Sequence, residues 1–429
     1  MGKRGKASSG RTRAARQGAE PYARSAPADA ERRAFLATSP ETALLVRRFV
    51  CWQQQHSWRK LEAVERIWAV SDLHMEHEAN VAFVRSLNGY EKDALIVAGD
   101  VCSSLLMLRG TLQLLVQKFR HVFYCVGNHD LWLDLASDGA DSFDKLMACY
   151  EIATEVGAHS APALIGKEGD GLVVFPLQSW YHFNFLEGGP LVDMPSDHEL
   201  RLMDSGCQWP RSIASSSTKA ELAILFAKCN EDAIAVAGGL RGRALPRDSK
   251  GASQESEGGV RRGRSLITFS HFLPRAELHR THPTKLADRL GNVEGSLLLG
   301  EQASAFLPLE PMAQSNHGDQ DGAIESRMIA RAFPIDMMLN GTRFLQHPLG
   351  NPKERAMLDG GGEFPLCNQT STIAPLALVW SSEAGMEKSR SDPSELSRWL
   401  VDLGAEWRAR SIHPRMKTRS QPEKGGMPA

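Results

Sequence analysis

RIWAVSDLH at residues 66–74 is followed by ALIVAGD at residues 94–100 and by VFYCVGNHD at residues 122–130. Each segment starts with a short apolar run and ends in polar residues, which is the pattern of a strand buried on both faces. Segments with helical spacing of apolar residues separate the three runs, at 81–87 and 105–119. The order strand, helix, strand, helix, strand predicts parallel neighbouring strands in an α/β fold.

The residues that end these strands are of the kinds that bind divalent metal ions. Asp72 and His74 follow the first strand, Asp100 the second and Asn128 the third. Ligands of open α/β sheets bind beyond the carboxyl ends of the strands, so we expect these side chains to lie close together. Carboxylate, imidazole and amide groups form the mixed oxygen and nitrogen set that divalent transition metals accept.

Taken in order, Asp72-Leu73-His74, Gly99-Asp100 and Gly127-Asn128-His129-Asp130 resemble the signature of the calcineurin-like metallophosphoesterase superfamily. The segment starting Ser270-His271 resembles the later lone-histidine motif of that family. The resemblance covers residues 66–356, with gaps. It implies an α/β fold in which two mixed β-sheets lie between layers of helices, a four-layer α-β-β-α sandwich.

The resemblance also implies a role for each site residue. Two divalent metal ions (Mn, Fe, Zn or Mg) would be bound by Asp72 and His74 on one side, by Asp100 as a bridge, and by Asn128 and His271 on the other. His129 would protonate the leaving group, with Asp130 as its orienting partner. Two cations bridged by a carboxylate lower the pKa of a shared water and neutralise the charge that grows during in-line attack.

One motif of the family is absent from the sequence. The family closes its site with Gly-His-x-His, and this chain contains no such tetrapeptide. Residues 303–331, where the motif would stand, lack clear strand or helix periodicity, and we interpret His317 and His347 as loop and structural residues. We hypothesise that unrelated sequence has replaced the motif, as in a splice variant or a mistaken gene model. Transcripts that all encode the same residues 295–340 would rule out the gene-model version.

The leading functional prediction is metal-dependent hydrolysis of a phosphomonoester or a phosphodiester. The substrate would be a phosphorylated small molecule, a nucleotide or a phosphoprotein. The alternative, favoured by the missing motif, is a catalytically impaired family member that acts as a binding or scaffold protein. A nuclease would need a basic groove, and the basic clusters at 11–16 and 261–264 lie in predicted disorder, so no clear nucleic-acid binding is expected.

Composition indicates which binding partners and which cellular compartment to expect. The 50 basic and 51 acidic residues give a net charge of -1, so no overall field indicates nucleic acid or an anionic membrane. No run of about 18 apolar residues predicts a transmembrane helix. The seven cysteines are scattered without a CxxC pair, which favours reduced thiols and an intracellular, cytoplasmic location. The basic N-terminal arm leaves organelle targeting open, and nothing fixes the oligomeric state.

The organisation expected along the chain has four parts. They are a disordered basic arm at 1–30, a helical lead-in at 31–64, the phosphoesterase domain at 65–356 and a loosely ordered C-terminal region at 357–429. Within the domain, residues 239–264 read as a disordered insertion and 303–331 as an atypical segment. Further elements are predicted as strands at 171–177 and 266–269, a helix at 218–237 and a hairpin turning at Asn340-Gly341.

Overall fold

The computed structural model describes only part of the chain. The described residues are 40–133, 139–166, 171–182, 185, 204, 206–210, 213, 220–242, 266–278, 294–305, 326–330, 335–339, 342–349 and 376–382. The predictions for residues 1–30 lie outside these ranges. The same holds for nearly all of the predicted insertion and C-terminal region, and for most of the atypical segment. The division into four parts therefore stays a prediction.

The three strands that open the predicted domain form most of the smaller sheet. They are β2 (Arg66–Val70), β3 (Ala94–Ala98) and β4 (His121–Cys125), and they run parallel in this order. The helices α3 (Glu78–Ser86) and α4 (Leu105–Lys118) connect them. Strand β11 (Ala377–Ser381) pairs antiparallel with β2, which makes this four-stranded sheet mixed.

A second, seven-stranded mixed sheet faces the first. Its strands, in spatial order, are β1 (Arg59–Leu61), β5 (Ala163–Ile165), β6 (Leu172–Pro176), β7 (Leu266–Phe269), β8 (Ser326–Ala330), β10 (Thr342–Gln346) and β9 (Ile335–Leu339). The strands predicted at 171–177 and 266–269 are confirmed as β6 and β7. The predicted hairpin is confirmed as well, since β9 and β10 pair antiparallel with Leu339 opposite Thr342.

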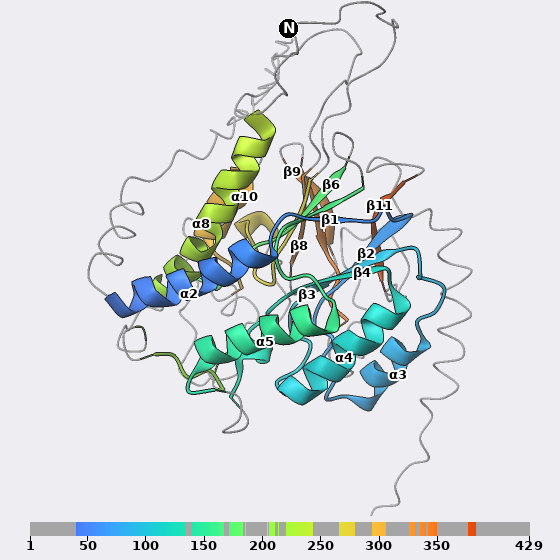
Figure 1. The fold of residues 1–429 in the computed structure, drawn as a ribbon, viewed down its shortest axis with the longest axis horizontal. Helices are drawn as coiled ribbons and strands as arrows, with labels where there is room; N and C mark the ends of the chain where they lie inside the picture. The colour runs from blue at the N-terminus through green and yellow to red at the C-terminus, as the bar shows by residue number, and fades with distance from the viewer. Residues whose placement is uncertain are drawn as a thin grey trace, which may run out of the picture.

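Helices flank the two sheets, as the resemblance implied. Figure 1 shows α3, α4 and α5 (Ser142–Val156) gathered on one side, with α8 (Ala220–Gly242) and α10 (Leu297–Ser304) on the other. Helix α2 (Pro40–His56) lies between α8 and α5, and its Trp52 stacks on Tyr150 of α5 at a centroid distance of 5.0 Å. The predicted α-β-β-α sandwich is therefore confirmed. No helix in the described ranges is long and apolar enough to cross a membrane.

Alternation along the strands explains why the apolar runs are continuous. In β2, Ile67 and Ala69 join a core cluster between the two sheets, together with Phe269 of β7. Trp68 and Val70 of the same strand join a second cluster that includes the flanking helices. Because successive side chains point to opposite faces, a strand covered on both faces must be apolar at every position.

Four strands were not predicted from the sequence: β1, β5, β8 and β11. Strand β11 lies inside the C-terminal region that was expected to be loosely ordered. Strand β1 lies inside the segment expected to be a helical lead-in, and β8 lies inside the segment where no periodicity was found. Both are short, and β8 pairs with β7 and β10, which are remote in sequence. Pairing with distant neighbours decides such strands, so their own few residues carry little signal.

The histidine that follows α5 gives the fold a pH dependence. Burial lowers the pKa of His159 to about 4, and the nearby His121 and Arg59 add to the shift. In the unfolded chain a histidine has a pKa of about 6.5, so below that pH the unfolded state binds more protons than the folded state. The free energy of unfolding should therefore fall as the pH drops from about 6.5 to about 4.

Between about pH 7.5 and about pH 4.5, we expect the free energy of unfolding of His159→Gln to fall by roughly 2 kcal/mol less than that of the unmodified chain. The measurement is urea unfolding of both proteins at about pH 7.5 and about pH 4.5. His77→Gln, at an exposed position, is the matched control and should leave the pH dependence unchanged. An equal loss of stability in His159→Gln and in the unmodified chain would contradict the assignment.

Candidate metal centre

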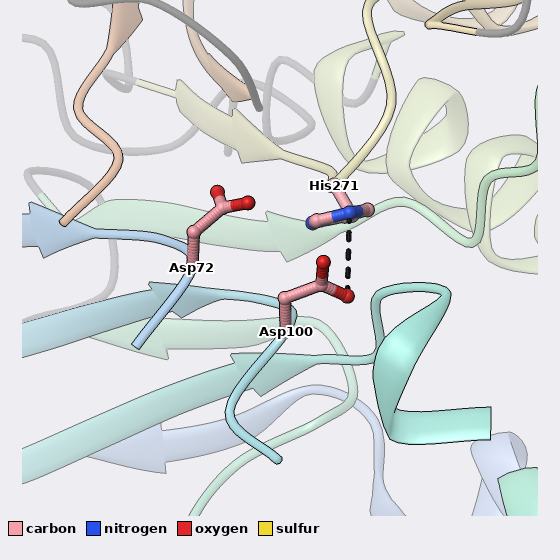
Figure 2. A group of neighbouring side chains, drawn as sticks. All are labelled: Asp72, Asp100 and His271. Atoms are coloured by element: carbon pink, nitrogen blue, oxygen red, sulfur yellow. Dashed lines mark ion pairs between the residues drawn. The ribbon is translucent and has the colours of Figure 1, made fainter. Parts of the chain in front are cut away.

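The carboxyl ends of β2, β3 and β4 meet the end of β7 at one edge of the sandwich. There the structure brings together Asp72, Asp100 and His271, with one ligand atom from each lying within 4.8 Å of the others. All three side chains are buried. Figure 2 shows them converging, with the His271 ring above the Asp100 carboxylate. Asp72 and Asp100 thus lie close together, as expected from the order of their strands, and His271, which only the family resemblance had indicated, lies beside them.

The backbone at this edge is held in an unusual conformation. Asp72, His74 and Asp100 have φ values of 54°, 38° and 54°, and the described residues contain one other non-glycine residue with positive φ, Trp58. Such conformations cost free energy and gather at functional sites, where surrounding contacts hold them. Here the two loops bind each other, because Asp72 N donates to Gly99 O and His74 N donates to Asp100 O, each at 3.0 Å.

Two glycines allow the ligand loops to approach closely. A Cβ added at Gly99, where φ is +83°, would lie 2.6 Å from Nδ1 of His271. A Cβ at Gly127 would lie 2.2 Å from Oδ1 of Asp100. Only a residue without a side chain fits at either position, so these glycines are required for the convergence of the ligands.

The imidazole of His271 is oriented by a backbone carbonyl. Its Nδ1 lies 2.9 Å from the carbonyl oxygen of Ala98, and that oxygen can only accept a hydrogen bond. Nδ1 is therefore the donor, which leaves the lone pair on Nε2. Nε2 lies 3.1 Å from Oδ1 of Asn128 and 3.5 Å from Oδ1 of Asp100.

These distances fit a shared cation. Ligand atoms bound at about 2.1 Å to one ion lie about 3.0 to 3.4 Å apart at octahedral or tetrahedral angles. The separations of Nε2 of His271 from the Asn128 and Asp100 oxygens are close to this range. One nitrogen and two oxygens suit a borderline divalent metal, so the residues present could hold an ion here.

His74 lies at the margin of the cluster. Its Nε2 is 3.9 Å from Oδ1 of Asp72, while the group of three within 4.8 Å does not include it. The loop that carries it is anchored by Asn80 of α3, whose amide donates to the carbonyls of Leu73 and His74 at 2.7 and 3.3 Å. Asp72 and His74 thus form a pair beside Asp100, and their role in binding a first metal stays a prediction.

Asp130 binds the backbone of both neighbouring ligand loops. Its Oδ2 accepts the N–H groups of Asp100 and Gly127 at 2.9 and 2.8 Å, and its Oδ1 accepts those of Val101 and Cys102 at 2.9 and 3.1 Å. Burial and the Asp100 carboxylate raise the pKa of Asp130 to about 7, although the backbone donors lower it. Asp130 therefore joins the two loops, and the orientation of the His129 ring by Asp130 stays a prediction.

His129 lies half-buried next to the cluster. Its backbone N–H donates to Oδ1 of Asp100 at 2.9 Å. Its ring meets the edge of His74 at 4.9 Å between centroids and stacks on Trp132 at 3.9 Å. Sequence reasoning missed Trp132, and its only signal was its place directly after the segment 127–131.

The backbone of His347 contacts the strand end that carries Asp72. Its carbonyl accepts the N–H of Ser71, the residue before Asp72, at 3.1 Å, and its side chain is buried. These contacts agree with the structural role predicted for it. His317, the other histidine considered as a replacement for the missing motif, lies outside the described residues.

Gly127→Ala tests whether the close approach of the Gly127 backbone to Asp100 is needed for metal binding. The added methyl group would displace Asp100, so we expect manganese affinity to fall at least about tenfold and the free energy of unfolding to fall by roughly 1–3 kcal/mol. Calorimetric titration with Mn²⁺ and urea unfolding measure the two effects. Gly110→Ala in α4, where a Cβ meets nothing within 4 Å, is the control and should stabilise the helix. Unchanged manganese binding in Gly127→Ala would contradict the predicted site.

Comparisons with known proteins support the resemblance seen in the sequence. Residues 65–205 match the family model described as calcineurin-like phosphoesterase. The chain is 33% identical over 129 residues to the acyl-carrier-protein phosphodiesterase PptH of Mycobacterium tuberculosis, a match that covers 29% of this chain and 40% of that protein. The aligned part thus spans less than half the length of this curated relative.

Two solved structures are also similar. The crystal structure of the phosphopantetheinyl hydrolase PptH from Mycobacterium tuberculosis aligns with a TM-score of 0.46 at 19% identity, covering 69% of this chain and 93% of that chain. The crystal structure of TT1561 from Thermus thermophilus aligns with a TM-score of 0.31 at 11% identity, covering 67% of this chain and 90% of that chain.

Proposed function

We propose that the chain is a metal-dependent phosphoester hydrolase, on the premise that residues 65–205 match the model of the calcineurin-like phosphoesterase family. The observation that carries the proposal is the orientation of His271. Its Nδ1–H is held by the Ala98 carbonyl, and its Nε2 faces the oxygens of Asn128 and Asp100. A buried imidazole lone pair aimed at two oxygen ligands is the arrangement of a metal site.

The proposed site holds two divalent ions. Asp72 and His74 would bind the first, Asn128 and His271 the second, and Asp100 would bridge them. The position of Asp100 supports the bridging role, because it lies in the group with Asp72 and also within 3.5 Å of His271. When bound, two such ions lower the pKa of a water and neutralise charge on the phosphoryl oxygens.

The residues of the chain supply the remaining steps. The His129 imidazole would hold the proton that the leaving oxygen takes up, a task suited to a histidine near neutral pH. Its backbone N–H, bound to Asp100, keeps it beside the proposed bridging ligand. Asp130 would fix the spacing of the loops that carry Asp100 and Asn128 through its four backbone hydrogen bonds.

A phosphodiester is the first substrate class to test. The relative that is 33% identical over 129 residues is named an acyl-carrier-protein phosphodiesterase. A phosphopantetheinyl acyl carrier protein should therefore be assayed beside small phosphodiesters and phosphomonoesters. Sequence and geometry leave a nucleotide, a phosphoprotein and a phosphorylated small molecule as further candidates within the same chemistry.

A binding or scaffold protein is the second candidate, and one specific observation favours it. The sequence contains no Gly-His-x-His, and in the family that motif supplies further imidazole ligands. If nothing replaces them, both metal affinity and activity should be lower. Metal content and turnover, measured on the same preparation, separate the two candidates.

We expect the purified chain with added Mn²⁺ to hydrolyse bis(4-nitrophenyl) phosphate or 4-nitrophenyl phosphate. Asp100→Asn, which preserves shape and tolerates positive φ, should lower kcat/KM by at least about 100-fold and lower bound manganese, because the bridging charge is lost. Glu91→Gln removes one negative charge at an exposed position and should change neither. The readouts are nitrophenolate release and manganese content by mass spectrometry.

Three outcomes distinguish the hydrolase from the scaffold protein. Manganese-dependent turnover lost in Asp100→Asn supports the hydrolase. Bound manganese without turnover on any phosphodiester or phosphomonoester favours the scaffold candidate. No bound manganese and no turnover would overturn the proposal of a metal-dependent enzyme.

A further inference from the structure

An indole ring packs against the proposed proton donor. The rings of His129 and Trp132 stack with a centroid distance of 3.9 Å and an interplanar angle of 26°. Among the described residues, the ring of His74 also lies near, with its centroid 4.9 Å away and its plane at 81° to that of His129. The His129 imidazole is thus bounded on one face by Trp132 and elsewhere by His74, which restricts its rotation.

Three contacts hold Trp132 itself in place. Its N–H donates to the His129 carbonyl at 3.2 Å, which closes a tight turn at the end of η1 (His129–Leu131). A Cβ added at Gly206 would lie 2.5 Å from Cγ of Trp132, so the backbone there packs directly on the indole. The Trp132 carbonyl accepts a hydrogen bond from Nζ of Lys145.

Lys145 is a buried cation in α5, with no exposed surface. Burying an ammonium group is costly unless it is well hydrogen-bonded, and Nζ donates to two backbone carbonyls, those of Ser103 and Trp132. Ser103 follows the loop of Asp100, and Trp132 follows His129. Lys145 therefore ties the loop of the proposed bridging ligand to the residue that stacks on the proposed acid.

We propose that Trp132, held by Lys145 and Gly206, is a positioning residue that fixes the His129 imidazole for proton transfer to the leaving group. The inference rests on the proposed function. In the step concerned, water oxygen forms a new bond to phosphorus and its proton passes to solvent. The bond from phosphorus to the leaving oxygen breaks, and that oxygen keeps the electron pair and takes a proton from His129.

Esters with leaving groups of different basicity show whether a mutation of Trp132 misplaces the proton donor or only disturbs the packing of the protein. Diphenyl phosphate releases phenolate, which is more basic than the nitrophenolate released by bis(4-nitrophenyl) phosphate. Protonation therefore matters more for diphenyl phosphate. A defect in the placement of His129 should slow the first ester far more than the second, whereas a loss of metal or of folded protein slows both alike.

The experiment compares Trp132→Leu, Trp132→Phe and His129→Ala with the unmodified chain, all loaded with Mn²⁺. For Trp132→Leu we expect kcat on diphenyl phosphate to fall at least about tenfold, with a loss below about threefold on bis(4-nitrophenyl) phosphate and little change in KM. Trp132→Phe retains an aromatic face and should recover most of the rate. Trp380→Leu is the matched control, because that half-buried tryptophan of β11 lies opposite Ile67, at the end of β2 away from Asp72.

A double-mutant cycle and a spectrum make the test decisive. Adding Trp132→Leu to His129→Ala should cause no further loss of kcat, because the group being positioned is already absent. In carbon-detected histidine NMR spectra of the proteins without Mn²⁺, which would broaden the signals, Trp132→Leu should move the His129 ring signals, assigned with His129→Ala, through loss of the indole ring current. This second readout needs no activity.

Several results would overturn the inference. These are an equal loss on both esters, a loss that persists in the His129→Ala background, or His129 signals that do not move. If the unmodified chain hydrolyses neither these esters nor 4-nitrophenyl phosphate, the proposed function fails and the proton-transfer role of Trp132 fails with it. Turnover of both esters with no leaving-group selectivity in Trp132→Leu overturns the positioning role alone.

Discussion

One buried carboxylate fixes the edge of the sandwich on which the site depends. Asp130 accepts backbone N–H groups from Asp100, Val101, Cys102 and Gly127, so it binds the ends of β3 and β4 to each other. A buried carboxylate is costly to desolvate, and the four donors offset part of that cost. The same four bonds hold Asp100 in its positive-φ conformation. Without these four hydrogen bonds the strand ends would still be adjacent, but the loops that carry the proposed ligands would not be held in a fixed position.

A second contact joins the two sheets. His271 follows β7 of the seven-stranded sheet, and its Nδ1 binds the carbonyl of Ala98 at the end of β3 in the other sheet. The hydrogen bond that connects the sheets also selects the tautomer, so sheet packing and the direction of the Nε2 lone pair are set together. Gly99 makes this possible, because any side chain there would collide with the imidazole. Lys145 binds the backbone carbonyls of Ser103 and Trp132, and the Trp132 ring stacks on His129, so a further set of contacts joins the Asp100 loop to His129.

The sequence predicted the parts of this arrangement that depend on strand order. Because β2, β3 and β4 are consecutive, parallel and buried, their carboxyl ends could be placed at one edge, and with them Asp72, Asp100 and Asn128. His271 lies 143 residues beyond Asn128 and came only from the family resemblance. Trp132, Lys145 and the backbone contacts of Asp130 were not predicted, since side-chain bonds to loop carbonyls and amides depend on loop geometry that no residue pattern encodes. Strand β8 was missed because its position depends on β7 and β10 rather than on its own five residues.

The central claim is that the buried oxygen and nitrogen atoms at this edge hold divalent metal. Crystals of the chain grown with Mn²⁺ and measured on both sides of the manganese absorption edge test it directly, because anomalous difference peaks locate the ions without reference to activity. The account predicts one peak bounded by Asp100, Asn128 and His271, and a second bounded by Asp72, His74 and Asp100. Well-ordered crystals in which those side chains surround no anomalous peak would contradict it.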